Sequence, residues 1–176
     1  PVTTPPRYGK TWLAAQTNGA QLVKAYEEIA AGIESMKEEI PITADISTSE
    51  ISKVWLCCRD DYPEHFWVGN NYYYSHKSNN KVTLVTPTYS MNATQKAAAQ
   101  TNLESQITAL LNGLHGGMSQ YDLEKAIHDR LVLHTSYVNV DFCHTAYGAL
   151  VNRQAVCDGY SRAFQLLCRR MGIETL

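Results

Sequence analysis

The sequence has no long apolar run and no block of charge of one sign. Its 176 residues are 44% hydrophobic and 18% charged, with a formal net charge of −2. A chain this apolar and this weakly charged is expected to fold around a sizeable core. It lacks the basic patch that typifies nucleic-acid-binding proteins and any apolar stretch long enough to span a bilayer. We therefore expect no nucleic-acid partner and no membrane span.

Cysteine is present, but the pattern of a disulfide framework or a zinc site is missing. An odd number of thiols at irregular spacing predicts at least one free cysteine. There is no Cys-x-x-Cys pair, and the neighbours Cys143 and His144 have no matching second pair, so no metal is expected. Nothing in the sequence indicates a cofactor. The cysteines are Cys57, Cys58, Cys143, Cys157 and Cys168.

Hydrophobic periodicity predicts that most of the chain is helical. The first ten residues contain three prolines and are predicted to form an extended arm. Ser47 to Glu50 has the form of a capping box, and Pro63 ends the helix that follows it. The pair Gly116-Gly117 is predicted to stop a later helix. Helices are predicted to begin near residues 17, 50, 120 and 157, with a short helical turn over 146–151. Another predicted helix follows Pro87, and its apolar stripe runs from Leu103 to Leu114.

Aromatic and β-branched residues between 66 and 86 predict one β-hairpin, with its turn at 78–80. Alternation along a strand places Tyr72 and Tyr74 on one face and Tyr73 on the other. The predicted fold class is therefore α+β, mostly helical with one β-hairpin.

Cys157 differs from the other cysteines in its position. It lies where the loop 152–156 passes into the last predicted helix. Unpaired backbone N–H groups and the helix dipole there favour a thiolate, which is the reactive form of a cysteine nucleophile. Asp158 works partly against ionisation, whereas Gly159 leaves one side of the first turn open. The alternative is that Cys157 is a small buried hydrophobe.

The surrounding motif favours the nucleophile. The residues Ala-Tyr-Gly-Ala-Leu-Val at 146–151 are followed by Ala-Val-Cys-Asp-Gly-Tyr-Ser at 155–161 and Met-Gly-Ile at 171–173. This segment resembles the nucleophile segment of the bacterial transglutaminase-like family. The predicted helix over 122–137 and the motif Tyr-Pro-Glu-His-Phe-Trp-Val at 62–68 are similar to upstream parts of that family. The resemblance covers the C-terminal third closely and the middle loosely.

The resemblance implies a papain-like core in which the cysteine opens a helix and a histidine and an aspartate follow on strands of a sheet. It assigns the nucleophile role to Cys157, with Tyr147, Gly159 and Tyr160 as supporting residues. All six histidines precede Cys157, so the family's partners are expected beyond Leu176. The expected domains are an N-terminal helical region with the hairpin at 1–117 and the start of an incomplete transglutaminase-like core at 118–176. That core lacks the sheet that follows the nucleophile helix.

The predicted function is that of a fragment of a thiol acyl-transfer enzyme, either a transglutaminase or a protease or amidase. The fragment is expected to be inactive, because the base that takes the thiol proton is missing. His144, thirteen residues before Cys157, is the one upstream substitute that we considered. The expected partner is a protein or peptide substrate. Bacterial relatives are often exported, which suggests an extracellular or cell-surface location.

An alternative function belongs to a different class. The chain is then a non-catalytic binding module whose aromatic hairpin binds cell-wall glycan or a protein. If the core is incomplete, faces made by Phe164 and Leu167 are expected to be partly exposed, and a homo-oligomer is predicted to cover them.

Overall fold

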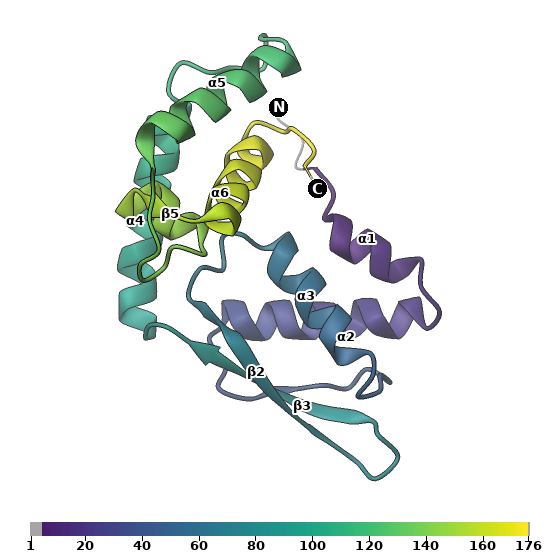
Figure 1. The fold of residues 1–176 in the computed structure, drawn as a ribbon. Helices are drawn as coiled ribbons and strands as arrows, with labels where there is room; N and C mark the ends of the chain where they lie inside the picture. Colours follow the sequence, from purple (N-terminus) through teal and green to yellow (C-terminus); the bar gives the residue numbers. More distant parts are fainter. Residues whose placement is uncertain (1–4, 176) are drawn as a thin grey trace. The chain divides into compact units, whose positions relative to one another are not determined.

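The computed structural model describes residues 5–175, and the chain divides into two compact units. One unit is Arg7–Ala93, and the other joins residues 5–6 to residues 94–175. Figure 1 shows the course of the chain through both units. The transglutaminase-like core was predicted to begin at residue 118. This domain boundary stays a prediction. No helix in the described part of the chain is long and apolar enough to cross a membrane.

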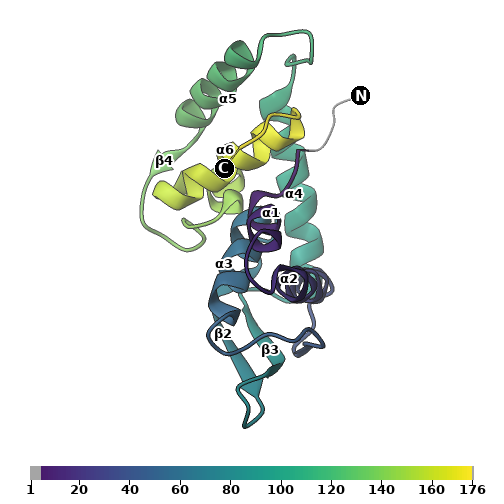
Figure 2. The ribbon, with the colours of Figure 1, turned by 90° about the vertical axis from the view of Figure 1, so that its right-hand side faces the viewer.

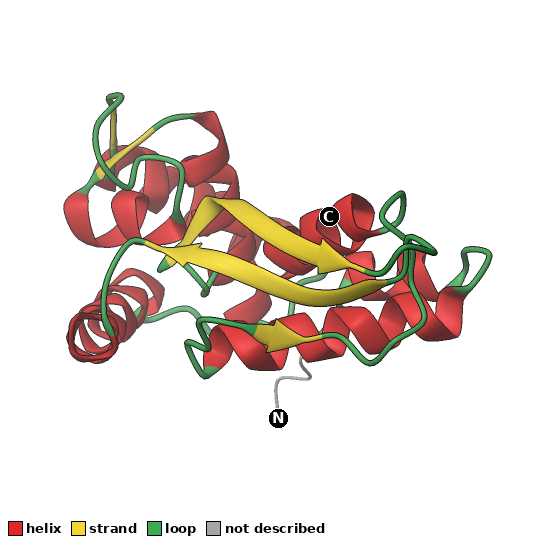
Figure 3. Ribbon diagram, turned by 90° about the horizontal axis from the view of Figure 1, so that it is seen from below, coloured by secondary structure: helices red, strands yellow, loops and turns green. Residues whose placement is uncertain are grey.

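The unit Arg7–Ala93 consists of three helices and a small antiparallel sheet. Figures 1 and 3 show the helices and the sheet. All three strands lie on one side of α2 and α3. The strand order is β1-β3-β2, so the predicted hairpin is confirmed and a third strand joins it. The elements are α1 (Tyr8–Ala14), α2 (Gly19–Glu34), β1 (Ile40–Pro41), α3 (Ile51–Asp61), β2 (Val68–His76) and β3 (Val82–Tyr89).

The predicted extended arm is wrong from Tyr8 onward, because α1 begins there; residues 1–4 lie outside the described part. The start of α1 is capped from a distance by Asp61, at the end of α3. Its buried carboxylate accepts hydrogen bonds from the Gly9 and Lys10 N–H groups at 2.9 and 2.8 Å, and from the Tyr26 hydroxyl at 2.8 Å. Burial and this bond raise the pKa of Tyr26. A cap fifty residues away leaves no mark in the local sequence.

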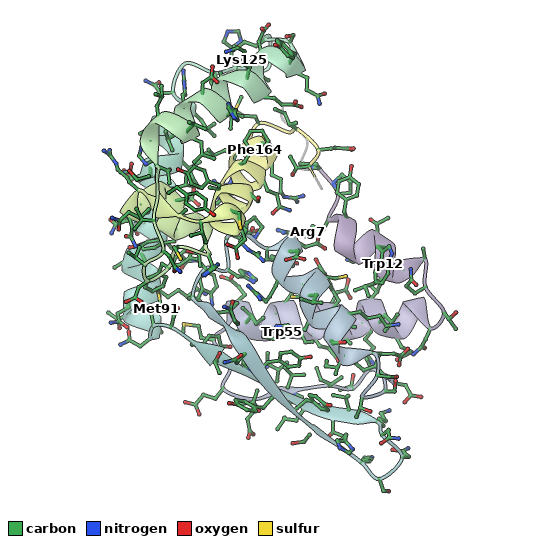
Figure 4. The ribbon with its side chains drawn as sticks, viewed as in Figure 1. Arg7, Trp12, Trp55, Met91, Lys125 and Phe164 are labelled. Carbon is green, nitrogen blue, oxygen red and sulfur yellow. The ribbon has the colours of Figure 1, made fainter. Side chains whose placement is uncertain are left out.

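A second contact ties the same two helix ends together. The Arg7 guanidinium donates to the main-chain carbonyl of Asp61 and lies 3.6 Å from the ring centroid of Tyr62. Figure 4 shows Arg7 at this end of α3. The two contacts together fix α1 against α3.

The faces of the hairpin are as predicted. The Tyr72 ring stacks on Trp55 of α3, with ring centroids 4.4 Å apart, and Tyr74 continues the row at 6.3 Å. Tyr73 points to the other face and is 66% exposed. Period-two alternation was sufficient to predict this arrangement.

The second unit contains three long helices and a two-residue parallel strand pair, β4–β5. Figures 1 and 2 show α5 and α6 near each other within this unit. The predicted helical turn over 146–151 is a π-helix, η1. The elements are α4 (Ala93–Leu111), α5 (Gln120–His134), β4 (Ser136–Tyr137), η1 (Gly148–Asn152), β5 (Gln154–Ala155) and α6 (Cys157–Arg170).

The predicted helix stop at Gly116-Gly117 is wrong, because α4 ends at Leu111. Gly113 has a φ of 78°, the left-handed conformation that terminates helices. The Arg130 guanidinium, from α5, donates to the carbonyls of Leu110 and Asn112 at 2.6 and 2.9 Å. The stop therefore comes from the first glycine that can take a positive φ, together with a cation on the helix C-terminus.

Leu167 was expected to be partly exposed, but it is buried at 1% exposure. Helix α5, η1 and β5 pack on α6 and cover this face. Phe164 is half-buried and lies on α6 as Figure 4 shows. The large exposed apolar side chains of this unit lie instead on α5 and just after it, with Leu133 at 89%. The homo-oligomer stays a prediction.

The distant cap on α1 gives a first test. Replacing Asp61 by Ala removes the acceptor of three buried or half-buried donors, so the free energy of unfolding is expected to fall by about 2–4 kcal/mol. Asp45→Ala removes only an exposed ion pair to Lys81 and is expected to change it by less than about 0.5 kcal/mol. Urea unfolding followed by circular dichroism measures both. Equal effects of the two substitutions would show that the cap contributes nothing.

Candidate functional site

Cys157 is the first residue of α6, and its side chain is exposed. All five cysteines lie in the described part of the chain and none forms a disulfide. Of the other four, three are buried and Cys57 is half-buried. Burial raises the pKa of Cys57 to about 11 and the pKa values of Cys58 and Cys168 to about 12. Cys157 is therefore the one cysteine of the five with an exposed sulfur at a helix start.

A backbone contact between the loop before η1 and the start of α6 positions this cysteine. The Cys143 carbonyl accepts a hydrogen bond from the Val156 N–H at 3.0 Å, one residue before Cys157. A Cβ atom on Gly159 would lie 2.1 Å from that same carbonyl oxygen. Gly159 is therefore required for the loop to approach the helix. The sequence alone predicted only that Gly159 leaves one side of the first helical turn open.

A second motif glycine permits the same loop to approach η1. A Cβ atom on Gly148 would lie 2.1 Å from the Phe142 carbonyl oxygen. Phe142 itself has a φ of 64°, the strained left-handed conformation for an aromatic residue. Both glycines of the Tyr-Gly and Cys-Asp-Gly-Tyr motifs thus accommodate one tight backbone segment, 142–143.

The parallel strand pair β4–β5 fixes the backbone just before Cys157. The Ser136 N–H donates to the Arg153 carbonyl at 2.9 Å, and the Val138 N–H donates to the Ala155 carbonyl at 3.1 Å. Strand β5 ends two residues before Cys157. The approach of the chain to the nucleophile is therefore fixed by two neighbouring backbone segments.

The supporting tyrosines pack around the site and their hydroxyl roles stay predictions. The Tyr160 hydroxyl donates to the Thr135 carbonyl, and its ring stacks on Tyr137 at 6.1 Å between centroids. Burial raises the pKa of Tyr160. Tyr147 contacts the Phe142 ring edge-on at 5.7 Å. Both rings therefore pack on neighbouring aromatic rings, and the Tyr160 hydroxyl is bonded to the Thr135 carbonyl.

The structure brings His144 to the start of α6, where it pairs with Asp158. Its Nδ1 lies 2.8 Å from Oδ1 of Asp158, the residue that follows Cys157. Within residues 5–175, no hydrogen bond joins a histidine nitrogen to the Cys157 sulfur. Sequence reasoning had weighed Asp158 only as a neighbouring charge. The two residues are fourteen positions apart, so no local pattern predicts their contact.

No cluster of three or more side chains that could ligate a metal occurs among the described residues. The arrangement is therefore that of an exposed thiol at a helix N-terminus, flanked by a His–Asp pair and held by two rigid backbone segments. Such a thiol can act as a nucleophile toward a carbonyl carbon.

Comparison with known families identifies this part of the chain. The model of the transglutaminase-like superfamily matches residues 108–175, which span the end of α4 through α6. No curated protein sequence matches the chain. The resemblance drawn from the motif around Cys157 is confirmed for this segment.

The contact at Gly159 gives a test of the site's construction. Gly159→Ala places a methyl group against the Cys143 carbonyl, and the resulting shift of backbone is expected to cost about 1–3 kcal/mol of unfolding free energy. Gly116→Ala is a suitable control, because a Cβ atom there meets nothing within 4 Å. Thermal unfolding of the two variants measures the difference. A Gly159→Ala protein as stable as Gly116→Ala would mean that the close approach is not needed.

Proposed function

We propose that Cys157 is the nucleophile of a thiol acyl-transfer enzyme, because the model of the transglutaminase-like superfamily matches residues 108–175. The observation that carries the proposal is the exposed sulfur at the first position of α6. Burial raises the pKa of Cys58 and Cys168 to about 12, so those two thiols are poor alternatives. The family match supports a papain-like cysteine enzyme as the wider class.

The proposed reaction begins with attack of the Cys157 sulfur on the carbonyl carbon of a carboxamide. A C–S bond forms, the C–N bond breaks, and the amine leaves with the proton that the thiol gave up. N–H groups in the first turn of α6 are suited to stabilise the oxyanion of the intermediate. Attack by a second amine on the thioester gives transglutaminase activity, and attack by water gives protease or amidase activity. Either step returns the proton to the thiol.

We further propose that the chain 1–176 by itself does not turn over such a substrate. The reaction needs a base, and the family's histidine is expected after the cysteine, whereas all six histidines here precede it. A protein or peptide with an accessible carboxamide is the proposed acyl donor.

A second function is favoured by the exposure of the hairpin. Tyr74 is 41% exposed, and its ring lies between those of Tyr72 and His76, at 6.3 and 6.2 Å between centroids. Tyr73, which is 66% exposed, lies on the opposite face of the hairpin. Aromatic rings in a row can stack on sugar rings. In this proposal the chain is a non-catalytic binding module whose hairpin binds a cell-wall glycan or a protein.

Site-resolved alkylation tests the nucleophile. Iodoacetamide at neutral pH is expected to label Cys157 at least about tenfold faster than Cys168, because the Cys168 thiol is buried and stays protonated. Peptide mass spectrometry over a time course measures both rates in one sample. The Cys157→Ser protein controls for labelling elsewhere. Labelling of Cys157 no faster than labelling of Cys168 would end the proposal.

Titration with cell-wall glycan fragments tests the hairpin. If the ring row binds sugar, Tyr74→Ala is expected to weaken binding about tenfold through the loss of one stacking surface. Tyr121→Ala, on α5 and 72% exposed, is the matched control. Calorimetry measures the affinities. Absence of binding by the unmodified protein, or equal affinities of the two variants, would exclude this function.

A further inference from the structure

The residue after the nucleophile presents an electrostatic conflict. Asp158 lies in the first turn of α6, where a carboxylate stabilises the helix N-terminus. The same negative charge beside Cys157 repels a thiolate and so slows every reaction that needs one. A site that uses Cys157 as a nucleophile therefore requires something that offsets the charge of Asp158.

Both contacts of the Asp158 carboxylate are made by the same oxygen atom. Oδ1 of Asp158 accepts a hydrogen bond from the Gly159 N–H at 3.1 Å and lies 2.8 Å from Nδ1 of His144. The side chains of His144 and Asp158 are half-exposed, at 50% and 44%. Among residues 5–175, the imidazole of His144 is the one side chain that pairs with Asp158.

His144 is held in this place by the backbone on both sides of it. On one side, the carbonyl of Cys143 is bonded to the Val156 N–H. On the other, the Thr145 hydroxyl donates to the Phe142 carbonyl at 2.8 Å and accepts from the Gly148 N–H at 3.0 Å. Hydrogen bonds of the neighbouring residues therefore fix the backbone of His144, and this backbone places the imidazole beside Asp158.

On the basis of the proposed function, we propose that His144 is a positioning residue for Cys157 and acts through Asp158. Its Nδ1–H donates to Asp158, and the positive end of this N–H dipole partly opposes the field of the carboxylate at the neighbouring sulfur. His144 does not touch the reacting atoms and takes no proton from the sulfur. This role differs from that of a substitute base, because it depends entirely on the charge of Asp158.

A double-mutant cycle tests this dependence, with the rate of Cys157 alkylation by iodoacetamide at neutral pH and low salt as the readout. His144→Ala is expected to slow the reaction about fivefold, because the Asp158 charge is then opposed only by the Gly159 N–H. Asp158→Asn is expected to react at least as fast as the unmodified protein. In the double variant, the loss of His144 is expected to have no further effect. Added salt is expected to restore much of the rate of His144→Ala.

A surface His–Asp pair on α5 provides the matched control. His128 Nδ1 lies 3.1 Å from Oδ1 of Asp129, and both side chains are about as exposed as the pair at the site. His128→Ala is expected to leave the Cys157 rate unchanged. Circular dichroism and the slow labelling of Cys168 report whether each variant is folded.

The possible outcomes separate this inference from the function on which it rests. A reactive Cys157 whose rate is the same in His144→Ala overturns the inference and leaves the nucleophile intact. A fivefold loss that persists in the Asp158→Asn background also overturns it, because His144 then acts as a base or as a purely structural residue. A fall in rate on Asp158→Asn alone, which leaves the loop untouched, contradicts it independently. An unreactive Cys157 in the unmodified protein overturns both proposals.

Discussion

The site depends on one close backbone approach, in which the segment 142–143 lies against the start of α6 and against η1. The Cys143 carbonyl accepts from the Val156 N–H, and the absence of a Cβ at Gly148 and Gly159 makes room for the two carbonyls of the segment. A backbone hydrogen bond between neighbouring turns is more rigid than any side-chain contact at an exposed site. It fixes where α6 begins, and therefore where the sulfur of Cys157 lies relative to the first N–H groups of the helix.

Several features of the site follow from that approach. Strand β5 pairs with β4, and this pairing fixes the direction from which the backbone leads into α6. The loop that makes the contact also carries His144, which explains how a residue fourteen positions away meets Asp158. Phe142 adopts a left-handed conformation, and the fixed surroundings of the turn maintain this strain. A strained turn, a π-helix and a helix N-terminus thus meet within one small region, as they often do at functional sites.

The sequence predicted the features that depend on local patterns. The helix that α2 forms, the alternation of Tyr72, Tyr73 and Tyr74, and the start of α6 at Cys157 all follow from short-range periodicity or helix-end chemistry. The motif around Cys157 also predicted the family that the comparison found for residues 108–175.

The features that the sequence did not predict depend on contacts between distant residues. The helix α1 was missed because its cap comes from Asp61. The stop of α4 has a local signal in Gly113, but the contact of Arg130 with the carbonyls of Leu110 and Asn112 is visible only in the fold. Strand β1 is only two residues long and contains Pro41, so it carries no alternation to detect. Gly159 was recognised as part of a motif, but its reason, the Cys143 carbonyl, is visible only in three dimensions.

The central claim is that the sulfur of Cys157 is placed to attack an acyl carbon, and an activated ester tests it without requiring a base. With p-nitrophenyl acetate, the Cys157 thiol gives its proton to the buffer, which replaces an enzyme base; a C–S bond forms, the ester C–O bond breaks and p-nitrophenolate leaves. Peptide mass spectrometry is expected to find the acetyl group on Cys157 and not on Cys58, Cys143 or Cys168, with no adduct in Cys157→Ser. An acetyl group spread over the other cysteines, or absent from Cys157, would contradict the account.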